Sequence, residues 1–223
     1  MSFSRRNYPK DTWTLRRRNQ LPPIMEDERE ESGWKPYNFT ITYPDVRSLI
    51  LTIGTLGEDL VGLELGLYRA ESFCTVLQCC PNVKKLYGVD SWQTYEDYVG
   101  TNGSRPGKVT NPQEMALARG MSYHFLYYSG EDHRGEILEM DAKEALLEFE
   151  DESLDFIFLD AYLSEQQCEQ ELRDWYPKVK TGGLFSGHDW DDAGIRSCVK
   201  KFHKNLTNPR SLVAYDSTWA FIK

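Results

Sequence analysis

Two short apolar segments of the sequence end in side chains that could do acid–base or metal chemistry. Residues 154–162 (LDFIFLDAY) contain Asp160, and residues 182–190 (GGLFSGHDW) contain His188 and Asp189. Apolar runs of this length without alternation are typical of strands buried on both faces of a parallel sheet. In open α/β sheets the ligand crevice lies beyond the carboxyl ends of such strands. We therefore expect the three side chains to meet at one edge of a sheet, which favours an enzyme.

The rest of the chain alternates apolar strand-like segments with segments of helical periodicity, as in α/β proteins. Strands are predicted at 60–66, 85–90, 135–141 and 154–160, after Thr181-Gly182-Gly183, and at 211–216 and 218–223. Helices are predicted at 69–80, from about Pro112, after residue 141, from Ser164 to about Val179, and from Ala193 to Leu206. Almost nothing separates the last two strands, which predicts an antiparallel hairpin at the sheet edge.

Length, charge and hydropathy argue against several classes of protein. A chain of 223 residues is long enough for one sizeable core. The net charge of −9 argues against a nucleic-acid-binding surface, which needs clustered Lys and Arg. No segment approaches the roughly 20 apolar residues of a membrane span, and the N-terminus lacks the apolar core of a secretory signal. We therefore expect a cytoplasmic protein without nucleic-acid or membrane partners.

The cysteines fit a reducing compartment. Their number is odd and none of them are spaced as CxxC, which argues against a disulfide framework and against a zinc site. We expect all of them to be small buried apolar side chains: Cys74, Cys79, Cys80, Cys168 and Cys198.

Composition divides the chain into an arm and a domain. Residues 1–36 hold a basic block followed by an acidic block and lack periodicity, which favours a polar, solvated arm. An arm that covers the active site or pairs subunits in a homodimer is the alternative. Residues 37–223 form the predicted domain. Within it, residues 93–122 interrupt the alternation with a segment rich in Gly, Asn, Thr and Pro, which we interpret as a substrate lid.

Five segments together resemble the class I S-adenosylmethionine-dependent methyltransferases. They are LELGLYRAES (63–72), LYGVDSW (86–92), LDFIFLDAY (154–162), LRDWYPKVKTGGLFSGHDW (172–190) and the terminal hairpin. The likeness is strongest to small-molecule O-methyltransferases such as the macrocin and catechol enzymes. It implies a Rossmann-like, doubly wound seven-stranded sheet with the last strand antiparallel. It also implies S-adenosyl-L-methionine as cofactor and a small hydroxylated acceptor, such as a sugar or a natural-product scaffold.

The first of these segments is the expected cofactor loop. Glycine at Gly66 lets the backbone approach a ligand closely, and the N-terminus of the following helix suits the carboxylate of the cofactor. The resemblance implies that Glu64 accepts from the cofactor's ammonium group and that Tyr68 lies in the binding loop. One position departs from the family pattern, because relatives usually carry a second glycine where this chain has Ala70.

Further cofactor contacts are implied after the second, third and fourth strands. Asp90 is placed like the carboxylate that holds the ribose hydroxyls, and a carboxylate can accept two such bonds. Trp92 could pack beside the adenine or be a core aromatic residue. Asp141 could contact the adenine edge or cap a helix. The resemblance adds four more candidate cofactor-binding residues: Ser91, Ala142, Asp160 and Tyr162.

The resemblance places catalysis at Asp160, His188 and Asp189. In metal-dependent relatives these positions hold a divalent cation, usually Mg²⁺, which acidifies the substrate hydroxyl. A histidine at 188 replaces a carboxylate, which weakens the case for Mg²⁺ and permits Mn²⁺ or another transition ion. Relatives often carry a catalytic Lys or His where this chain has Leu163. His188 could therefore be the general base, a metal ligand together with both aspartates, or a structural residue.

Two other readings compete with a methyltransferase. A nicotinamide-dependent oxidoreductase would need GxGxxG after the first strand, and LGLYRA lacks it. A methyltransferase-like module that binds a cofactor or a partner without catalysis is compatible with the departures at 70, 163 and 188. Asp191 or Asp192 is expected to cap the helix at Ala193 rather than bind metal. No role is assigned to the remaining histidines, His124, His133 and His203.

Overall fold

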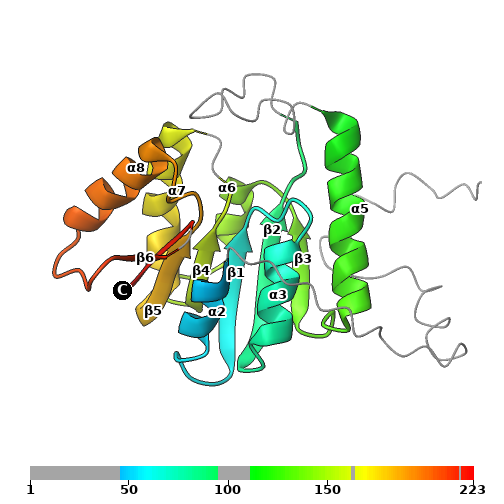
Figure 1. Cartoon of the computed structure of the whole chain (residues 1–223), viewed down its shortest axis with the longest axis horizontal. Helices are drawn as coiled ribbons and strands as arrows, with labels where there is room; N and C mark the ends of the chain where they lie inside the picture. The colour runs from blue at the N-terminus through cyan, green and yellow to red at the C-terminus, as the bar shows by residue number, and fades with distance from the viewer. Residues whose placement is uncertain (1–45, 95–110, 162–163, 216) are drawn as a thin grey trace, which may run out of the picture. The chain divides into compact units, whose positions relative to one another are not determined.

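The computed structural model describes residues 46–94, 111–161, 164–215 and 217–223 (Figure 1). The predicted arm at 1–36, residues 95–110 of the predicted lid, Tyr162 and Leu163 lie outside the described residues. Predictions about them, including the domain boundary, stay predictions.

A seven-stranded sheet forms the centre of the domain, in the order β3-β2-β1-β4-β5-β7-β6. Strands β1 to β5 pair in parallel, and β7 pairs antiparallel with both β5 and β6. The predicted Rossmann-like sheet with an antiparallel last strand is confirmed. The strand bounds are β1 Leu60–Leu65, β2 Val83–Asp90, β3 Gly135–Glu139, β4 Leu154–Leu159, β5 Val179–Gly187, β6 Val213–Tyr215 and β7 Thr218–Ile222.

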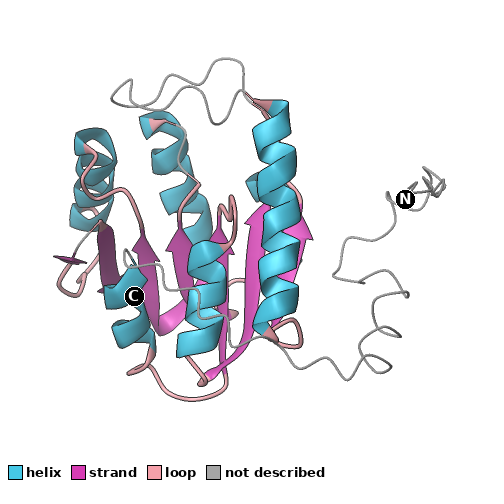
Figure 2. Ribbon diagram, turned by 45° about the vertical axis from the view of Figure 1, so that its right-hand side comes forward, coloured by secondary structure: helices cyan, strands magenta, loops and turns pink. Residues whose placement is uncertain are grey.

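Helices cover both faces of the sheet, and each layer buries its own apolar cluster (Figure 2). On one face lie α2 (Arg47–Ile53), α3 (Glu71–Cys79) and α5 (Pro112–Ser129), packed around Phe73, Leu77 and Phe156. On the other lie α6 (Ala142–Ala145), α7 (Glu165–Trp175) and α8 (Ala193–Lys204), packed around Trp175 and Phe185. None of these helices, nor any other in the described part of the chain, combines the length and hydrophobicity that a bilayer-spanning helix needs.

Side-chain caps fix where four of the helices begin. Asn111 accepts from the amides of residues 113 and 114 at the start of α5, and Asp141 accepts from the amide of residue 143 at α6. Ser164 caps α7 and Asp192 caps α8 in the same way, as predicted. Each cap satisfies amides that otherwise lack a partner in the first turn. Helix α3 differs, because Ala70 at its N-cap position gives no side-chain hydrogen bond.

The structure departs from the sequence analysis in three places. The helix expected up to Val179 ends at Trp175, because Pro177 has no amide hydrogen and a 3-10 turn (Tyr176–Lys178) follows; Val179 already pairs with Leu154 in the sheet. Helix α2 was not predicted at all. Among the cysteines Cys79 is exposed, whereas the other four are buried as expected.

Candidate active site

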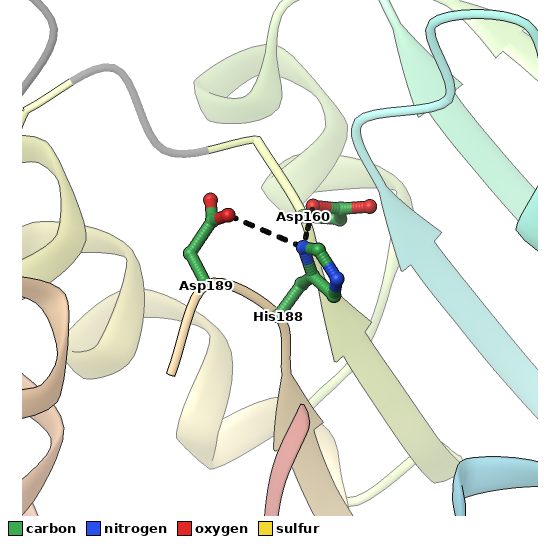
Figure 3. Close-up of side chains that lie close together, drawn as sticks. All are labelled: Asp160, His188 and Asp189. Carbon is green, nitrogen blue, oxygen red and sulfur yellow. Dashed lines mark ion pairs between the residues drawn. The ribbon is translucent and has the colours of Figure 1, made fainter. Parts of the chain in front are cut away.

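The predicted trio meets at the carboxyl ends of β4 and β5 (Figure 3). The amide of Asp160 donates to the carbonyl of Leu65 at 2.7 Å, and the amide of His188 donates to the carbonyl of Leu159 at 2.9 Å. Sheet hydrogen bonding thus continues one residue past each strand and fixes both backbones. Asp189 follows with a left-handed φ of 58°. The sheet register therefore brings Asp160 to two side chains that lie 28 and 29 positions further along the sequence.

One imidazole nitrogen faces both carboxylates. Nδ1 of His188 lies 3.2 Å from Oδ1 of Asp189 and 3.4 Å from Oδ1 of Asp160. The His188 side chain is 13% exposed, compared with 23% for Asp160 and 46% for Asp189, so the site opens on the Asp189 side. Nε2 of His188 is buried and has no hydrogen-bond partner among the described residues.

The charges around His188 determine its protonation. Burial lowers the pKa of the imidazole, but hydrogen bonds and charge from Asp160 and Asp189 outweigh it and raise the pKa to about 10. In this arrangement His188 therefore carries two protons at neutral pH. An imidazolium cannot accept a proton from a substrate, so the geometry disfavours the predicted neutral base.

The same atoms fit a divalent cation. One ligand atom from each of the three side chains can be chosen so that all lie within 4.8 Å of one another. A cation would replace the proton that now neutralises the carboxylates, since metal binding requires a neutral imidazole. One nitrogen with two carboxylate oxygens suits Mn²⁺ or another transition ion better than Mg²⁺, which prefers oxygen alone.

Glu64 lies behind this site, at the end of β1. It is buried with 1% of its surface exposed, and it accepts a hydrogen bond from the hydroxyl of Ser72 on α3. Burial raises the pKa of Glu64 well above its ordinary value, and the negative charge of Asp160 adds to the rise, although the Ser72 bond and His188 oppose it. A cation that reached Glu64 would reverse this penalty, in line with the predicted contact to an ammonium group.

Gly66 is required by the backbone that faces it. Its φ is 87°, and a Cβ atom there would lie 2.4 Å from the carbonyl oxygen of Asp160. We predicted close approach of a ligand, but in this structure the close neighbour is the chain after β4. The cofactor loop and the trio are thus in direct contact through Gly66.

Asp90 shapes the cofactor loop. Its Oδ2 accepts from the amides of Leu67 and Tyr68 at 2.9 Å each, and its Oδ1 accepts from the amide of Trp92 at 2.7 Å. Burial nevertheless raises the pKa of Asp90 above its ordinary value, because these three bonds offset desolvation only in part. Each carboxylate oxygen can accept more than one bond, so the predicted ribose contact stays compatible with this role.

A comparison with known protein families identifies the family of this chain. A family described as "Methyltransferase domain" matches residues 63–190, which begin in β1 and end just after the trio. The chain belongs to this methyltransferase family.

Solved structures share the fold of this methyltransferase. A putative O-methyltransferase from Klebsiella pneumoniae is 15% identical, with a TM-score of 0.56 over 92% of this chain and 91% of that chain. An O-methyltransferase from Bacillus cereus, solved in complex with SAH, is 12% identical, with a TM-score of 0.57 over 90% and 89%. An S-adenosylmethionine-dependent O-methyltransferase from Thermotoga maritima is 16% identical, with a TM-score of 0.54 over 89% and 70%. These likenesses establish the fold. No curated protein sequence is detectably similar to the methyltransferase.

A cavity of about 450 Å³ adjoins Asp90 in the methyltransferase. It lies between the ends of β2 and β3 and the first turns of α5, and its lining is Ser91, Trp92, Gln93, Thr94, Pro112, Ala116, Arg119 and Glu139. Trp92 is only 7% exposed and its indole nitrogen donates to the carbonyl of Tyr68 at 2.8 Å. It therefore serves as a core residue and also lines the cavity. Asp141 and Ala142 are not among the lining residues, and Asp141 caps α6.

Sequence reasoning missed two residues of α5 that hold the cofactor loop of the methyltransferase. The hydroxyl of Ser122 donates to the carbonyl of Tyr68 at 2.9 Å. Glu114 accepts from the hydroxyl of Tyr68 and, at 2.8 Å, from the guanidinium of Arg69. Neither residue stands in a motif, and only the packing of α5 against α3 brings them to the loop. The departure at Ala70 also has a structural reading: its φ of 59° is a conformation that glycine adopts without strain.

Proposed function

We propose that this methyltransferase transfers the methyl group of S-adenosylmethionine to a hydroxyl oxygen of a small acceptor. The observation that carries the proposal is the contact between the Gly66 loop and the Asp160–His188–Asp189 trio. It puts the groups that would hold the cofactor next to groups that can control a hydroxyl proton. The acceptor oxygen forms a bond to the methyl carbon, and the carbon–sulfur bond breaks with its electron pair going to sulfur. The hydroxyl proton passes to water, and S-adenosylhomocysteine, a neutral thioether, remains.

Charge complementarity supports the choice of cofactor. S-adenosylmethionine carries a sulfonium and an ammonium, and the carboxyl groups of Glu64, Asp90 and Asp160 line the ends of adjacent strands. A cationic ligand that reached Glu64 would favour its charged form and offset the burial that raises its pKa. The carboxylate of the cofactor needs donors, and the first turn of α3 begins without a side-chain cap. The cavity beside Asp90 offers room for the adenosine end.

We further propose that the trio holds a divalent cation of the Mn²⁺ type. Such an ion, when bound, lowers the pKa of a hydroxyl that it contacts. Asp160 and Asp189 would contribute carboxylate oxygens, and His188 a ring nitrogen that gives up its proton on binding. The geometry supports this role, because the two carboxylates that face Nδ1 of His188 at 3.4 and 3.2 Å would attract a cation to the same place.

The test begins with binding and then measures turnover. Purified protein is titrated calorimetrically with S-adenosylmethionine and with S-adenosylhomocysteine, in EDTA and in excess Mn²⁺ or Mg²⁺. Methyl transfer is then assayed with catechols, sugars and phenolic scaffolds. We expect cofactor binding in every condition, and turnover that Mn²⁺ restores after EDTA more strongly than Mg²⁺. No binding in any condition would falsify the proposal, and turnover unaffected by EDTA would remove the metal from it.

Variants at the trio complete the test. H188A is expected to abolish the metal response, because it removes the nitrogen ligand. H124A is the matched control, since His124 is an exposed histidine on α5 outside the trio. Full activity in H188A would rule out both the ligand role and the base role of His188.

A further inference from the structure

Helix α5 contacts the loop between β1 and α3 through its first turn. Glu114 lies in that turn, after the Asn111 cap and Pro112. One carboxylate oxygen, Oε1, accepts from the hydroxyl of Tyr68 and from Nη2 of Arg69, the latter at 2.8 Å. A single side chain on α5 thus holds two consecutive residues of the loop.

Tyr68 is held from three elements at once. Its amide donates to Asp90 at the end of β2, and its carbonyl accepts from Trp92 and from Ser122 on α5. Its hydroxyl donates to Glu114, 46 positions away in the sequence. All three polar groups of Tyr68 are therefore fixed, by Asp90 at the end of β2, by Trp92 just after it, and by α5.

The loop needs such support because its backbone is unfavourable. Tyr68 has a φ of 48° and Ala70 has a φ of 59°, both in the left-handed region. A non-glycine residue there costs about 1–2 kcal/mol and persists only where the surroundings hold it. Asp90 and Trp92 constrain the backbone of Tyr68, and Glu114 is the group that constrains its side chain together with that of Arg69.

The charges around Glu114 strengthen its contacts with Tyr68 and Arg69. The Arg69–Glu114 ion pair is partly shielded, with side chains 32% and 28% exposed. Burial and the bond to Glu114 raise the pKa of Tyr68 above its ordinary value, so the phenol keeps its proton and continues to donate. Charge-assisted bonds of this kind are stronger than neutral ones.

We propose that Glu114 is a positioning residue that holds the Gly66–Ser72 loop in the conformation that binds the cofactor. It acts through Tyr68 and Arg69 and touches no reacting atom. The inference rests on the proposed cofactor site, because it assigns this loop to the cofactor.

The experiment compares E114A, E114Q and Y68F with Q113A. Gln113 is an exposed residue in the same turn of α5, so Q113A is matched in position and lacks the contact. We expect the Kd for S-adenosylhomocysteine to rise about tenfold in E114A, the effect of losing one to two hydrogen bonds to a charged group. E114Q should lie between E114A and wild type, and kcat at saturating cofactor should change by less than about twofold.

Two measurements keep the outcomes distinct. Amide hydrogen exchange of residues 67–72 should be faster in E114A than in Q113A, with or without ligand, whereas exchange in β4 and β5 should not change. The Y68F and E114A effects on Kd should be less than additive, because they remove the same bond. If E114A does not fold, Y68F still removes the hydroxyl alone.

Different results would overturn the proposed function and the positioning role of Glu114. Absence of binding by the wild-type protein overturns the proposed function, and the positioning role falls with it. Binding by the wild type, with Kd and loop exchange of E114A and Y68F equal to those of Q113A, overturns the positioning role alone.

Discussion

The two halves of the site differ in what their polar groups contact. At the ends of β1 and β2, Asp90 accepts three backbone amides, Glu64 is bonded to Ser72, and Tyr68 is held through amide, carbonyl and hydroxyl. At the ends of β4 and β5, two carboxylates converge on one nitrogen of His188, and its other nitrogen has no partner within the described chain.

Under the proposed function, this difference separates cofactor binding from chemistry. The cofactor half has its shape before any ligand arrives, which lowers the ordering cost of binding. In the chemical half, the negative charges of Asp160 and Asp189 are compensated only while a positive charge lies between them, either protonated His188 or a cation. Changes in the first half should therefore alter affinity, and changes in the second should alter turnover.

The largest effect is expected from a substitution that changes the trio and leaves the Gly66–Ser72 loop intact. D160N keeps the size of the side chain but removes a charge next to His188, and turnover should fall by at least about a hundredfold. The Kd for S-adenosylhomocysteine should stay within about threefold of wild type, because this ligand lacks the sulfonium charge that Asp160 would face and because Asp90 and the loop are intact. Steady-state kinetics and calorimetry measure the two effects, with D174N, at a half-buried aspartate on α7 outside the site, as control. Equal losses of affinity and turnover would show that the halves are not separable.

A methyl group at Gly66 should damage both halves together. G66A places a Cβ atom 2.4 Å from the carbonyl of Asp160 in a left-handed residue, so we expect a loss of about 3 kcal/mol in the free energy of unfolding, with weaker binding and slower turnover. G182A is the matched control: its φ is 86°, yet nothing lies within 4 Å of the added carbon. Urea unfolding of G66A and G182A distinguishes the cost of backbone strain, which both share, from the cost of the clash with Asp160, which only G66A has. Equal destabilisation would argue against a contact between loop and trio.

Glu171 lies outside both halves and serves as a comparison, because its carboxyl group is buried while one of its oxygens has no hydrogen bond to a described residue. Burial raises its pKa to about 7 from an ordinary 4.5, despite a bond from Gln167, and Oε2 has no partner in the described structure. Because the folded-state pKa is raised, ionisation favours unfolding, and stability present below the unfolded pKa is lost as pH rises through about 7. Between about pH 5 and pH 8 the wild type should lose about 2 kcal/mol that E171Q keeps. Urea unfolding across pH measures this, and parallel curves for the two proteins would contradict it.

The smallest effect is expected at Ala70, within the cofactor half. A70G relieves a left-handed alanine but removes a fully buried methyl group, two effects of about 1 kcal/mol that oppose each other. We expect stability to change by less than about 1 kcal/mol and the Kd for cofactor by less than about twofold. Thermal unfolding and calorimetry test this. A large gain in affinity would mean that the alanine weakens the loop.

The trio could be predicted from the sequence because of the positions of its residues relative to the strands. Asp160 and His188 directly follow apolar strands, and the parallel order of β4 and β5 brings such positions together. The caps Ser164 and Asp192 were predictable for a similar reason, since capping depends on a few adjacent residues. Contacts between residues far apart in the sequence were not predictable. Glu114 and Ser122 reach Tyr68 from 46 and 54 positions away, and the proton on His188 follows from two carboxylates that only the folded chain places beside it.

The pinning of Tyr68 also has a consequence for the time course of binding. A loop already fixed by Asp90, Trp92, Ser122 and Glu114 has no slow rearrangement to complete when ligand arrives. The observed rate in stopped-flow mixing should then rise linearly with cofactor concentration, without the plateau that a preceding isomerisation would impose. Any slow phase in the catalytic cycle is expected to originate in the steps that engage His188, not in the capture of the methyl donor.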